Sequence, residues 1–139
     1  MEQWETGFPQ LRAAYEAWND TKGASIDQWT ELLADELDFR SLAGGKAGVP
    51  WTETCRTREE VRAYLAGLTS TFRMEHYTVE RFVCQGDAIV VVAATAWHHI
   101  ASGRRLDTPI ITMWRFHNGK AFSFFEYYDT AAVAAAVGA

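Results

Sequence analysis

The sequence predicts a single α+β domain over residues 1–139, in which a strongly curved, mostly antiparallel sheet and helices enclose a cone-shaped apolar pocket. Apolar residues recur with helical spacing in the first half, and the second half changes to strand-like segments separated by turns. Helices segregated from an antiparallel sheet are typical of the α+β class. Aromatic residues make up 14% of the chain, and rigid aromatic rings are common in ligand pockets.

Three helices are expected in the first half. Residues 8–22 carry apolar side chains at three- and four-residue steps, and Pro9 suits the first turn of this helix. A second helix is expected over residues 26–34, with Ser25 as its N-cap. Residues 57–60 (TREE) form a capping box that opens the third helix. The apolar face of that helix consists of Val61, Tyr64, Leu65 and Leu68.

A short strand and a long loop separate the second and third helices. Residues 36–41 alternate in polarity and predict the strand. Residues 42–56 form a Gly-rich connection that carries Trp51. Loops of this length inside a small domain often form lids or binding loops.

Four strands of an antiparallel meander are expected next, followed by a terminal helix. The Asn118-Gly119 pair is a strong signal for a hairpin turn between the last two strands. The Ala-rich C-terminal segment predicts a short helix with Asp129 as its N-cap. The expected strands are residues 74–84, 87–101, 106–117 and 120–128.

Composition narrows the classes of partner. The net charge of −5 argues against nucleic acid, because phosphate binding needs clustered Lys and Arg. No run of 18 apolar residues is present, so no membrane partner is expected. Cys55 and Cys84 show no metal or redox spacing, and no secretory signal is visible. We therefore expect a cytoplasmic protein with reduced thiols.

Three segments carry a resemblance to a known family. They are YEAWND (15–20), LLADELDFR (32–40) and WRFHNGKAFSFFEYYDTAAV (114–133). The chain resembles the SnoaL-like branch of the nuclear transport factor 2-like superfamily over nearly its whole length. Relatives there include ketosteroid isomerase, limonene epoxide hydrolase, scytalone dehydratase, SnoaL-type polyketide cyclases and binding modules without activity. The resemblance implies the curved fold and a homodimer formed through the outer face of the sheet.

Aligning the resembling segments shows which residues of this chain stand where ketosteroid isomerase has its catalytic groups. Its general base falls on Arg40, and its oxyanion-hole acid falls on Thr112. Its tyrosine falls at Ala14, one place before Tyr15. All three groups are replaced, which disfavours steroid isomerisation by that arrangement.

The other two enzymes match in part. The acid on the last strand of the epoxide hydrolase matches Glu126, whereas its Arg and Asp fall on Ala93 and Thr95. The carboxylate–histidine pair of scytalone dehydratase could be formed by His99 with Asp38 or Glu126.

Glu126 is the leading catalytic candidate. Two-residue spacing places Phe122, Phe124 and Tyr128 on its face of the strand. If this face lines the pocket, loss of water raises the carboxyl pKa toward neutrality, which suits proton transfer. Alternatively, the face contacts a dimer partner, or Glu126 pairs with Arg115.

His99 is the second candidate, because alternation places it with Thr95 and Trp97, on the side that the family match assigns to the pocket. Histidine titrates near neutrality, although a structural, hydrogen-bonded histidine fits the pattern equally well. Metal-type spacing is absent around the histidines, and neither a metal nor a cofactor is expected.

Asp38 and Arg40 share a face of the first strand, where they form either a charge pair at the pocket wall or a solvated edge. An inward Arg40 would bind an anionic group or keep Glu126 ionised.

The favoured function is a cofactor-independent acid–base enzyme, a cyclase, isomerase or dehydratase, that acts on a small hydrophobic oxygenated molecule. Glu126 would move the proton with His99 as partner, Asp38 and Arg40 would set the charge, and Thr112 or Tyr15 would donate to an oxyanion. The alternatives are an epoxide hydrolase in which Glu126 activates water, and a binding or assembly module without turnover. Tyr15 and Trp18 fit the core as well as the site. The predicted substrate contacts are Tyr15, Trp18, Trp51, Thr95, Trp97, Thr112, Trp114, Phe124 and Tyr128.

Overall fold

The structure, a computed structural model, describes residues 2–138. The helices are α1 (Gln3–Asp20), α2 (Ile26–Leu32), α3 (Arg58–Thr71) and α4 (Thr130–Val137), with a 3₁₀ turn η1 (Pro50–Thr52). The strands are β1 (Leu33–Ser41), β2 (Phe72–Gln85), β3 (Ala88–His99), β4 (Arg105–His117) and β5 (Lys120–Tyr128). No helix among these residues is long and apolar enough to cross a membrane.

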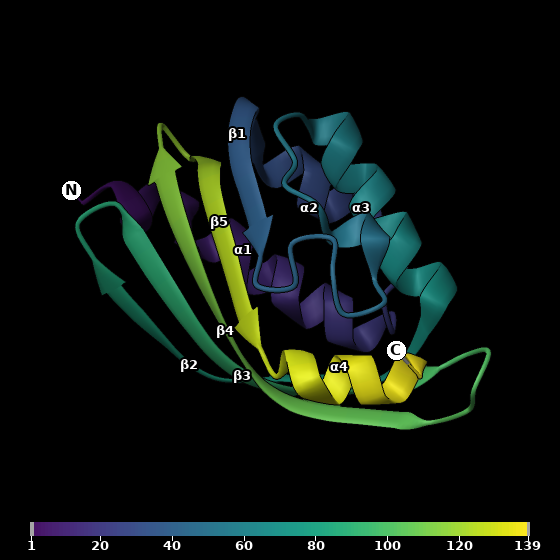
Figure 1. Cartoon of the computed structure of the whole chain (residues 1–139). Coiled ribbons are helices and arrows are strands. Elements are labelled where there is room, and N and C mark those ends of the chain that lie inside the picture. Colours follow the sequence, from purple (N-terminus) through teal and green to yellow (C-terminus); the bar gives the residue numbers. More distant parts are fainter. Residues whose placement is uncertain (1, 139) are drawn as a thin grey trace.

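The five strands form one curved sheet in the order β1-β5-β4-β3-β2. The pairs from β2 to β5 are antiparallel, as expected from the meander, and β1 adds to the edge in parallel with β5. Figure 1 shows the sheet curving around α1, with α2 and α3 beside it and α4 across the end of the sheet. The predicted α+β class with helices on the concave side of a curved sheet is confirmed.

Three local signals in the sequence form the contacts they predict. The Thr57 hydroxyl accepts the Glu60 backbone N–H at 3.1 Å and caps α3. Asn118 and Gly119 both have positive φ, at 50° and 78°, as a two-residue hairpin turn requires. The Asp129 carboxylate caps α4. Short-range chemistry therefore determines these boundaries.

The two N-terminal helices differ from the prediction at their ends. Helix α1 begins at Gln3, so Pro9 lies inside it and not in its first turn. The earlier start is stabilised by Glu5, whose carboxylate accepts the Glu2 backbone N–H at 2.7 Å. Ser25 makes no capping bond, and among the described residues its buried hydroxyl has no hydrogen-bond partner.

A β-bulge in β5 changes which aromatic side chains face inward. Arg115 and Phe116 are neighbours on β4, but their partners Ser123 and Ala121 lie two residues apart on β5. Phe122 is therefore the extra residue of the bulge. It lies on the outer face beneath the guanidinium of Arg115, 5.1 Å from the ring centroid. The expectation that Phe122 shares a face with the candidate acid is wrong, because strict alternation ends at the bulge.

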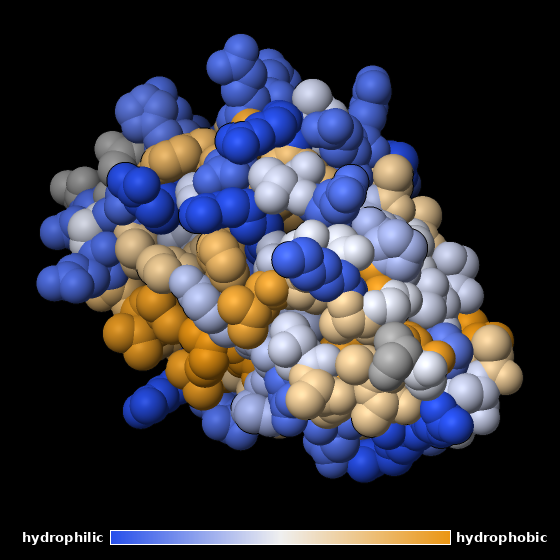
Figure 2. Space-filling model, viewed as in Figure 1, coloured by the Kyte–Doolittle hydropathy of each residue, from blue (hydrophilic) through white to orange (hydrophobic). Residues whose placement is uncertain are grey.

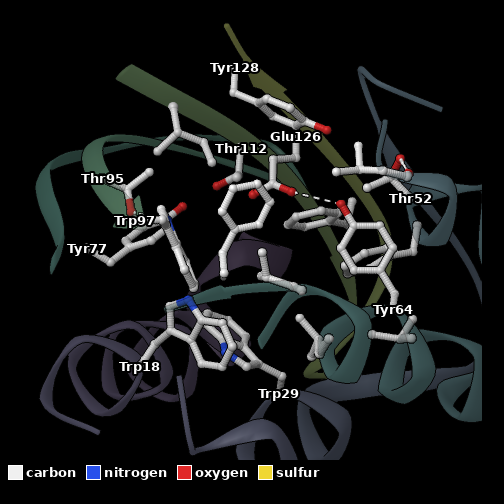
Figure 3. Close-up of a pocket in the computed structure, with 18 of the residues that line it drawn as sticks. Trp18, Trp29, Thr52, Tyr64, Tyr77, Thr95, Trp97, Thr112, Glu126 and Tyr128 are labelled. Atoms are coloured by element: carbon white, nitrogen blue, oxygen red, sulfur yellow. Dashed lines mark hydrogen bonds between the residues drawn. The ribbon is translucent and has the colours of Figure 1, made fainter. Parts of the chain in front are cut away.

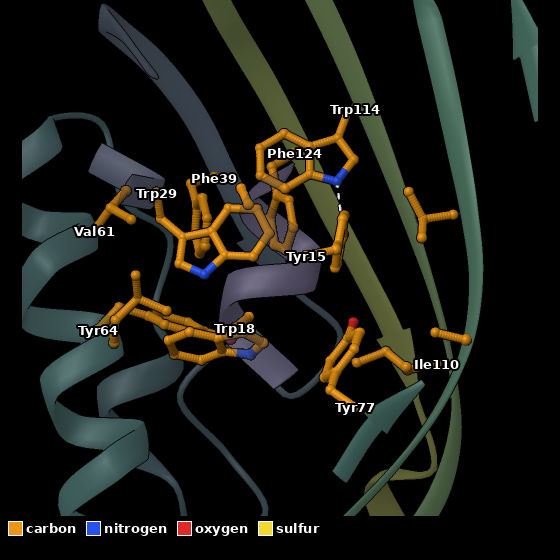
Figure 4. Close-up of a cluster of buried hydrophobic side chains, with 14 of the residues drawn as sticks. Tyr15, Trp18, Trp29, Phe39, Val61, Tyr64, Tyr77, Ile110, Trp114 and Phe124 are labelled. Carbon is orange, nitrogen blue, oxygen red and sulfur yellow. Dashed lines mark hydrogen bonds between the residues drawn. The ribbon is translucent and has the colours of Figure 1, made fainter. Parts of the chain in front are cut away.

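Aromatic rings form a large part of the core between the sheet and the helices (Figure 4). Trp29 of α2 stacks on Trp114 of β4, with ring centroids 5.6 Å apart. Phe39 of β1 stacks on Phe124 of β5 at 4.1 Å. The first stack joins the helical layer to the sheet, and the second joins the neighbouring strands β1 and β5 on the concave side.

The outer face of the sheet carries a smaller apolar group. Figure 2 shows polar residues over most of the visible surface and apolar residues gathered over the strands. Met113 and Tyr127 are 37% and 39% exposed. Phe125 stacks on Tyr127, with centroids 4.4 Å apart. This is the face through which the resemblance implies a dimer, and that assembly stays a prediction.

Candidate functional site

A cavity of about 100 Å³ lies between the concave face of the sheet and the helices. One water needs only about 10–15 Å³ on this measure, so the space suits a small molecule. Among residues 2–138, the lining contains one carboxylate and no Arg, Lys or His. Twelve of the 25 lining residues are aromatic: Tyr15, Trp18, Trp29, Phe39, Trp51, Tyr64, Phe72, Tyr77, Trp97, Trp114, Phe124 and Tyr128.

The single carboxylate is that of Glu126, which points from β5 into the cavity (Figure 3). The backbone of this residue pairs with Thr112 on β4 and Ser41 on β1, so it lies well inside the sheet. The residue is half-buried, because its side chain faces the hollow and not packed atoms. Burial raises the pKa of Glu126 to about 7, and a hydrogen bond from Tyr64 opposes the shift.

Tyr64 of α3 is the hydrogen-bond partner of this acid. Its hydroxyl donates to Oε2 of Glu126 at 3.2 Å. Burial raises the pKa of Tyr64 well above its ordinary value, so the phenol keeps its proton and remains a donor. Sequence reasoning placed Tyr64 on the apolar face of its helix and did not assign it to the site. A buried tyrosine hydroxyl needs a polar partner, and this was the available signal.

A second polar group lies beside the acid. The hydroxyls of Tyr15 and Thr112 are 2.6 Å apart, and the indole N–H of Trp114 donates to the Tyr15 oxygen at 2.9 Å. The two hydroxyls carry two hydrogens, of which their mutual bond uses one, so one remains to donate to a ligand or to a neighbouring oxygen. Tyr77 of β2 also interacts with Tyr15 and lines the cavity. Its role was not found from the sequence.

All nine positions predicted to contact a substrate line the cavity. Some of their polar atoms are already paired within the protein. The indole N–H of Trp97 donates to Thr95 at 2.7 Å, and the Thr95 hydroxyl donates to the His76 carbonyl at 2.8 Å. The hydroxyl of Tyr128 is hydrogen-bonded to Ser41. These side chains therefore shape the wall, and contact with a substrate stays a prediction.

Trp51 comes from the long loop, as the sequence suggested. Its ring packs edge-on against Tyr64, with centroids 5.3 Å apart. The loop is braced by Thr52, whose hydroxyl accepts from the Gly45 N–H and donates to the Val49 carbonyl. Trp51 thus supports the tyrosine that holds the acid.

His99 lies outside the cavity, which corrects its predicted place beside Glu126. Its Nδ1 is 2.8 Å from the Ser102 hydroxyl, and its ring packs against Phe72. The Ser102 hydroxyl in turn donates to the Ala136 carbonyl of α4. Strand β3 ends at His99, so this side chain takes part in the turn that follows and not in the wall. The structural interpretation of His99 is the correct one.

Asp38 and Arg40 also lie outside, on the outer face of β1. Asp38 pairs with the Arg40 guanidinium at 3.1 Å and with Arg56 at 3.3 Å. Arg40 lies over the Phe125 ring at 4.7 Å from its centroid. Phe39 faces inward instead, because alternation puts the apolar side chains of β1 in the core. The expected charge pair at the pocket wall is therefore wrong, and the solvated alternative holds.

Ligands for a metal are not assembled near the cavity. Within residues 2–138, no three His, Cys, Asp or Glu side chains lie close enough together to hold an ion. Cys55 and Cys84 are both free thiols. Among the described lining residues, the ionisable side chains are one carboxyl and four phenols.

Solved structures share this fold. An NTF2-like protein of unknown function from Burkholderia pseudomallei superposes with a TM-score of 0.80 at 22% identity, covering 96% of this chain and 98% of that one. A hypothetical protein with a ketosteroid isomerase-like fold from Catenulispora acidiphila, in complex with trimethylamine, gives a TM-score of 0.75 at 20% identity, with coverages of 93% and 92%. TerC, co-crystallised with polyporic acid, gives 0.79 at 17% identity, with coverages of 96% and 99%. Identities this low show the fold alone.

The family is shown by a match in sequence. No curated protein matches the chain. The family model described as the SnoaL-like domain matches residues 11–124, which is most of the chain and includes four of the five strands in full. The chain therefore belongs to the SnoaL-like domain family.

Proposed function

We propose that this protein is a cofactor-independent acid–base enzyme that moves a proton on a small, largely apolar, oxygenated molecule. The observation that carries the proposal is Glu126, the one carboxylate among the described residues that line the aromatic cavity, with a pKa raised to about 7 by burial. A group that titrates near ambient pH is the most effective proton carrier. The reaction types that fit are isomerisation, cyclisation and dehydration.

The side chains around Glu126 suggest a division of roles. Tyr64 holds Oε2, which leaves Oε1 to accept a proton from a carbon next to a carbonyl group. As the C–H bond breaks, its electron pair moves onto the carbonyl oxygen. The spare hydroxyl hydrogen of the Tyr15–Thr112 pair can donate to that oxyanion. Return of the proton to a second carbon completes an isomerisation without any cofactor.

The proposed partner of Glu126 is thus a set of phenols and not His99. Thr112 pairs with Glu126 across β4 and β5, so the donor and the acid share one face of the sheet. Burial raises the pKa of Tyr15, and the nearby negative charge of Glu126 adds to this shift, which supports placing the two groups at one site. A neutral tyrosine hydroxyl beside a carboxylate base is a suitable pair for enolate formation.

The substrate must be inferred from the lining and not from the fold. One structural neighbour is in complex with trimethylamine and another was co-crystallised with polyporic acid, two very different molecules. One fold can therefore hold different ligands, and the side chains of the cavity select among them.

The test is deuterium exchange followed by NMR. Small cyclic ketones and β,γ-unsaturated ketones are incubated in D₂O with wild type, with Glu126→Gln and with the outer-face control Glu75→Gln. We expect wild type to exchange the α-hydrogens with an apparent pKa near 7. The Glu126→Gln variant should be slower by about 10²–10⁴-fold, the usual contribution of a positioned acid or base. The control should match wild type.

Three results would contradict the proposal. Exchange that is equally fast in Glu126→Gln would remove the acid from the mechanism. Hydrolysis of small epoxides that depends on Glu126, without ketone exchange, would assign the epoxide hydrolase alternative. Saturable ligand binding without turnover of either class would assign the binding module.

A further inference from the structure

We infer that the ligand of this cavity is a small organic cation, an amine or quaternary ammonium compound whose charged nitrogen lies between Glu126 and the surrounding aromatic faces. The inference rests on the proposed function only in taking Glu126 as the group that meets the ligand. It adds a sign of charge to the ligand class, which neither the fold nor the family defines.

The first argument is the charge of the cavity wall. Among the described lining residues, Glu126 is the single ionisable carboxylate, and no basic side chain accompanies it. The arginines of the neighbouring strands lie on the outer face, where Arg40 pairs with Asp38 and Arg115 pairs with Asp87. An anionic ligand would therefore meet an acid and no cation. A cationic ligand would supply the counter-charge that the described lining lacks.

The second argument comes from the groups that face Glu126 from each packed element. The titratable ones are all phenols: Tyr15 from α1, Tyr64 from α3, Tyr77 from β2 and Tyr128 from β5. Burial raises the pKa of each, so all four stay neutral while Glu126 titrates. The elements α2, β1, β3, β4 and α4 contribute Trp29, Phe39, Thr95, Trp97, Thr112, Trp114 and Val133, none of which titrates.

The third argument is the aromatic wall itself. A cation over the face of Trp or Tyr is attracted by the electron-rich ring, and aromatic cages are the usual site for quaternary ammonium groups. Trp18 and Trp29 lie on the helix side of the cavity below the acid, with Trp97 and Tyr77 on one side and Tyr64 on the other (Figure 3). Rings and carboxylate therefore favour the same charge.

A positive charge near the reacting carbon would also aid the proposed chemistry. Removal of a proton by Glu126 leaves negative charge on the substrate, and an adjacent ammonium stabilises it. The same ammonium keeps Glu126 ionised, because an opposite charge at short distance lowers a carboxyl pKa.

The test uses three probes of matched shape and different charge: choline, 3,3-dimethylbutan-1-ol and 3,3-dimethylbutanoate. Choline and the alcohol differ by the exchange of N⁺ for carbon. Binding is followed by tryptophan fluorescence and calorimetry at pH 8. We expect choline to bind at least about tenfold more tightly than the alcohol, and the carboxylate to bind most weakly.

Two variants test whether the preference for choline over the alcohol depends on the Glu126 carboxylate. In Glu126→Gln, choline should bind within about threefold of the alcohol, while the alcohol keeps its wild-type affinity, which shows that the cavity is intact. The outer-face control Glu75→Gln should keep the full preference for choline. In wild type, the affinity for choline should fall about tenfold per unit as the pH drops below 7, and that for the alcohol should stay level.

The inference is overturned if wild type binds the alcohol or the carboxylate as tightly as choline, or if choline shows no saturable binding. It is equally overturned if the preference for choline is undiminished in Glu126→Gln. Failure of the inference is distinct from failure of the proposed function. Glu126-dependent exchange on neutral ketones without cation preference removes only the inference, whereas cation preference without turnover removes only the enzyme.

Discussion

The two faces of the sheet shift the pKa of a glutamate side chain in opposite directions. Glu75 lies on the outer face of β2, where the Arg105 guanidinium at 2.7 Å and then His98 lower its pKa to about 2. Glu126 lies on the inner face of β5, where burial raises its pKa to about 7. A glutamate is a permanent anion in one place and a proton carrier in the other. The proton chemistry of a carboxyl is therefore a property of its surroundings.

The difference extends to the other charges of the sheet. On the outer face, Asp38 and Asp87 are paired with arginines in contact with water. On the inner face, the described lining provides phenols and indoles but no cation. Guanidinium groups are costly to bury, so they stay outside, and the enclosed acid keeps its proton more readily.

The greatest change should follow from altering the outer apolar face, through which a homodimer is predicted. Met113 and Phe125 are paired across β4 and β5 on this face. We expect the double variant Met113→Lys/Phe125→Lys to have half the mass of wild type in sedimentation equilibrium, since two lysines would be desolvated at the interface. The exposed control Glu36→Lys should remain dimeric. A monomeric wild type would refute the dimer.

Replacing the inner acid should change stability with pH. Below about pH 4.5 the Glu126 carboxyl is protonated in both folded and unfolded chains, so Glu126→Gln should have little effect. Between about 4.5 and 7 only the unfolded chain ionises, and wild type loses stability. At pH 8 the variant should be more stable by about 3 kcal/mol in urea unfolding. A variant that gains no stability would show that the acid is not desolvated.

The outer acid should give the reverse dependence. The pKa of Glu75 is lowered in the folded chain, so its contribution is present above about pH 4.5 and is lost as the pH falls toward 2. Glu75→Gln should therefore be less stable than wild type at pH 7 and equal to it near pH 2. Parallel pH profiles for the two glutamine variants would contradict the contrast between the faces.

Within the cavity, the Tyr15 hydroxyl should matter more than that of its neighbour. Tyr15→Phe leaves the buried Trp114 indole N–H without an acceptor, which costs about 1–3 kcal/mol. Thr112→Val keeps the Trp114–Tyr15 bond and should cost about 0.5–1.5 kcal/mol. Thermal or urea unfolding of both variants measures the difference. Equal costs would mean that Trp114 finds another acceptor.

The smallest effect is expected at Asp38. Its partners Arg40 and Arg56 are well exposed, and ion pairs in water contribute about 0–1 kcal/mol. Asp38→Asn should therefore change the free energy of unfolding by less than about 1 kcal/mol and leave deuterium exchange unaltered. Loss of deuterium exchange in this variant would show that Asp38 takes part in the proposed reaction.

The sequence predicted most of the fold because the signals are local. Capping by Thr57 and Asp129 and the Asn118-Gly119 turn depend on residues a few positions apart. Errors arose where geometry overrides a simple pattern. The bulge at Phe122 broke the alternation. On β1 the family match suggested an inward Arg40, although the apolar Phe39 beside it already indicated the buried face.

By itself, the sequence determined the order of elements and the aromatic surroundings of Glu126 on its strand, because periodicity and turn chemistry act over short stretches. Only the tertiary structure decided which groups meet that acid. Tyr64 reaches it across 62 positions of the chain, and Tyr15 meets Thr112 across 97. A carboxyl pKa depends on such distant neighbours and on the exclusion of water, and both arise only when the helices close over the sheet.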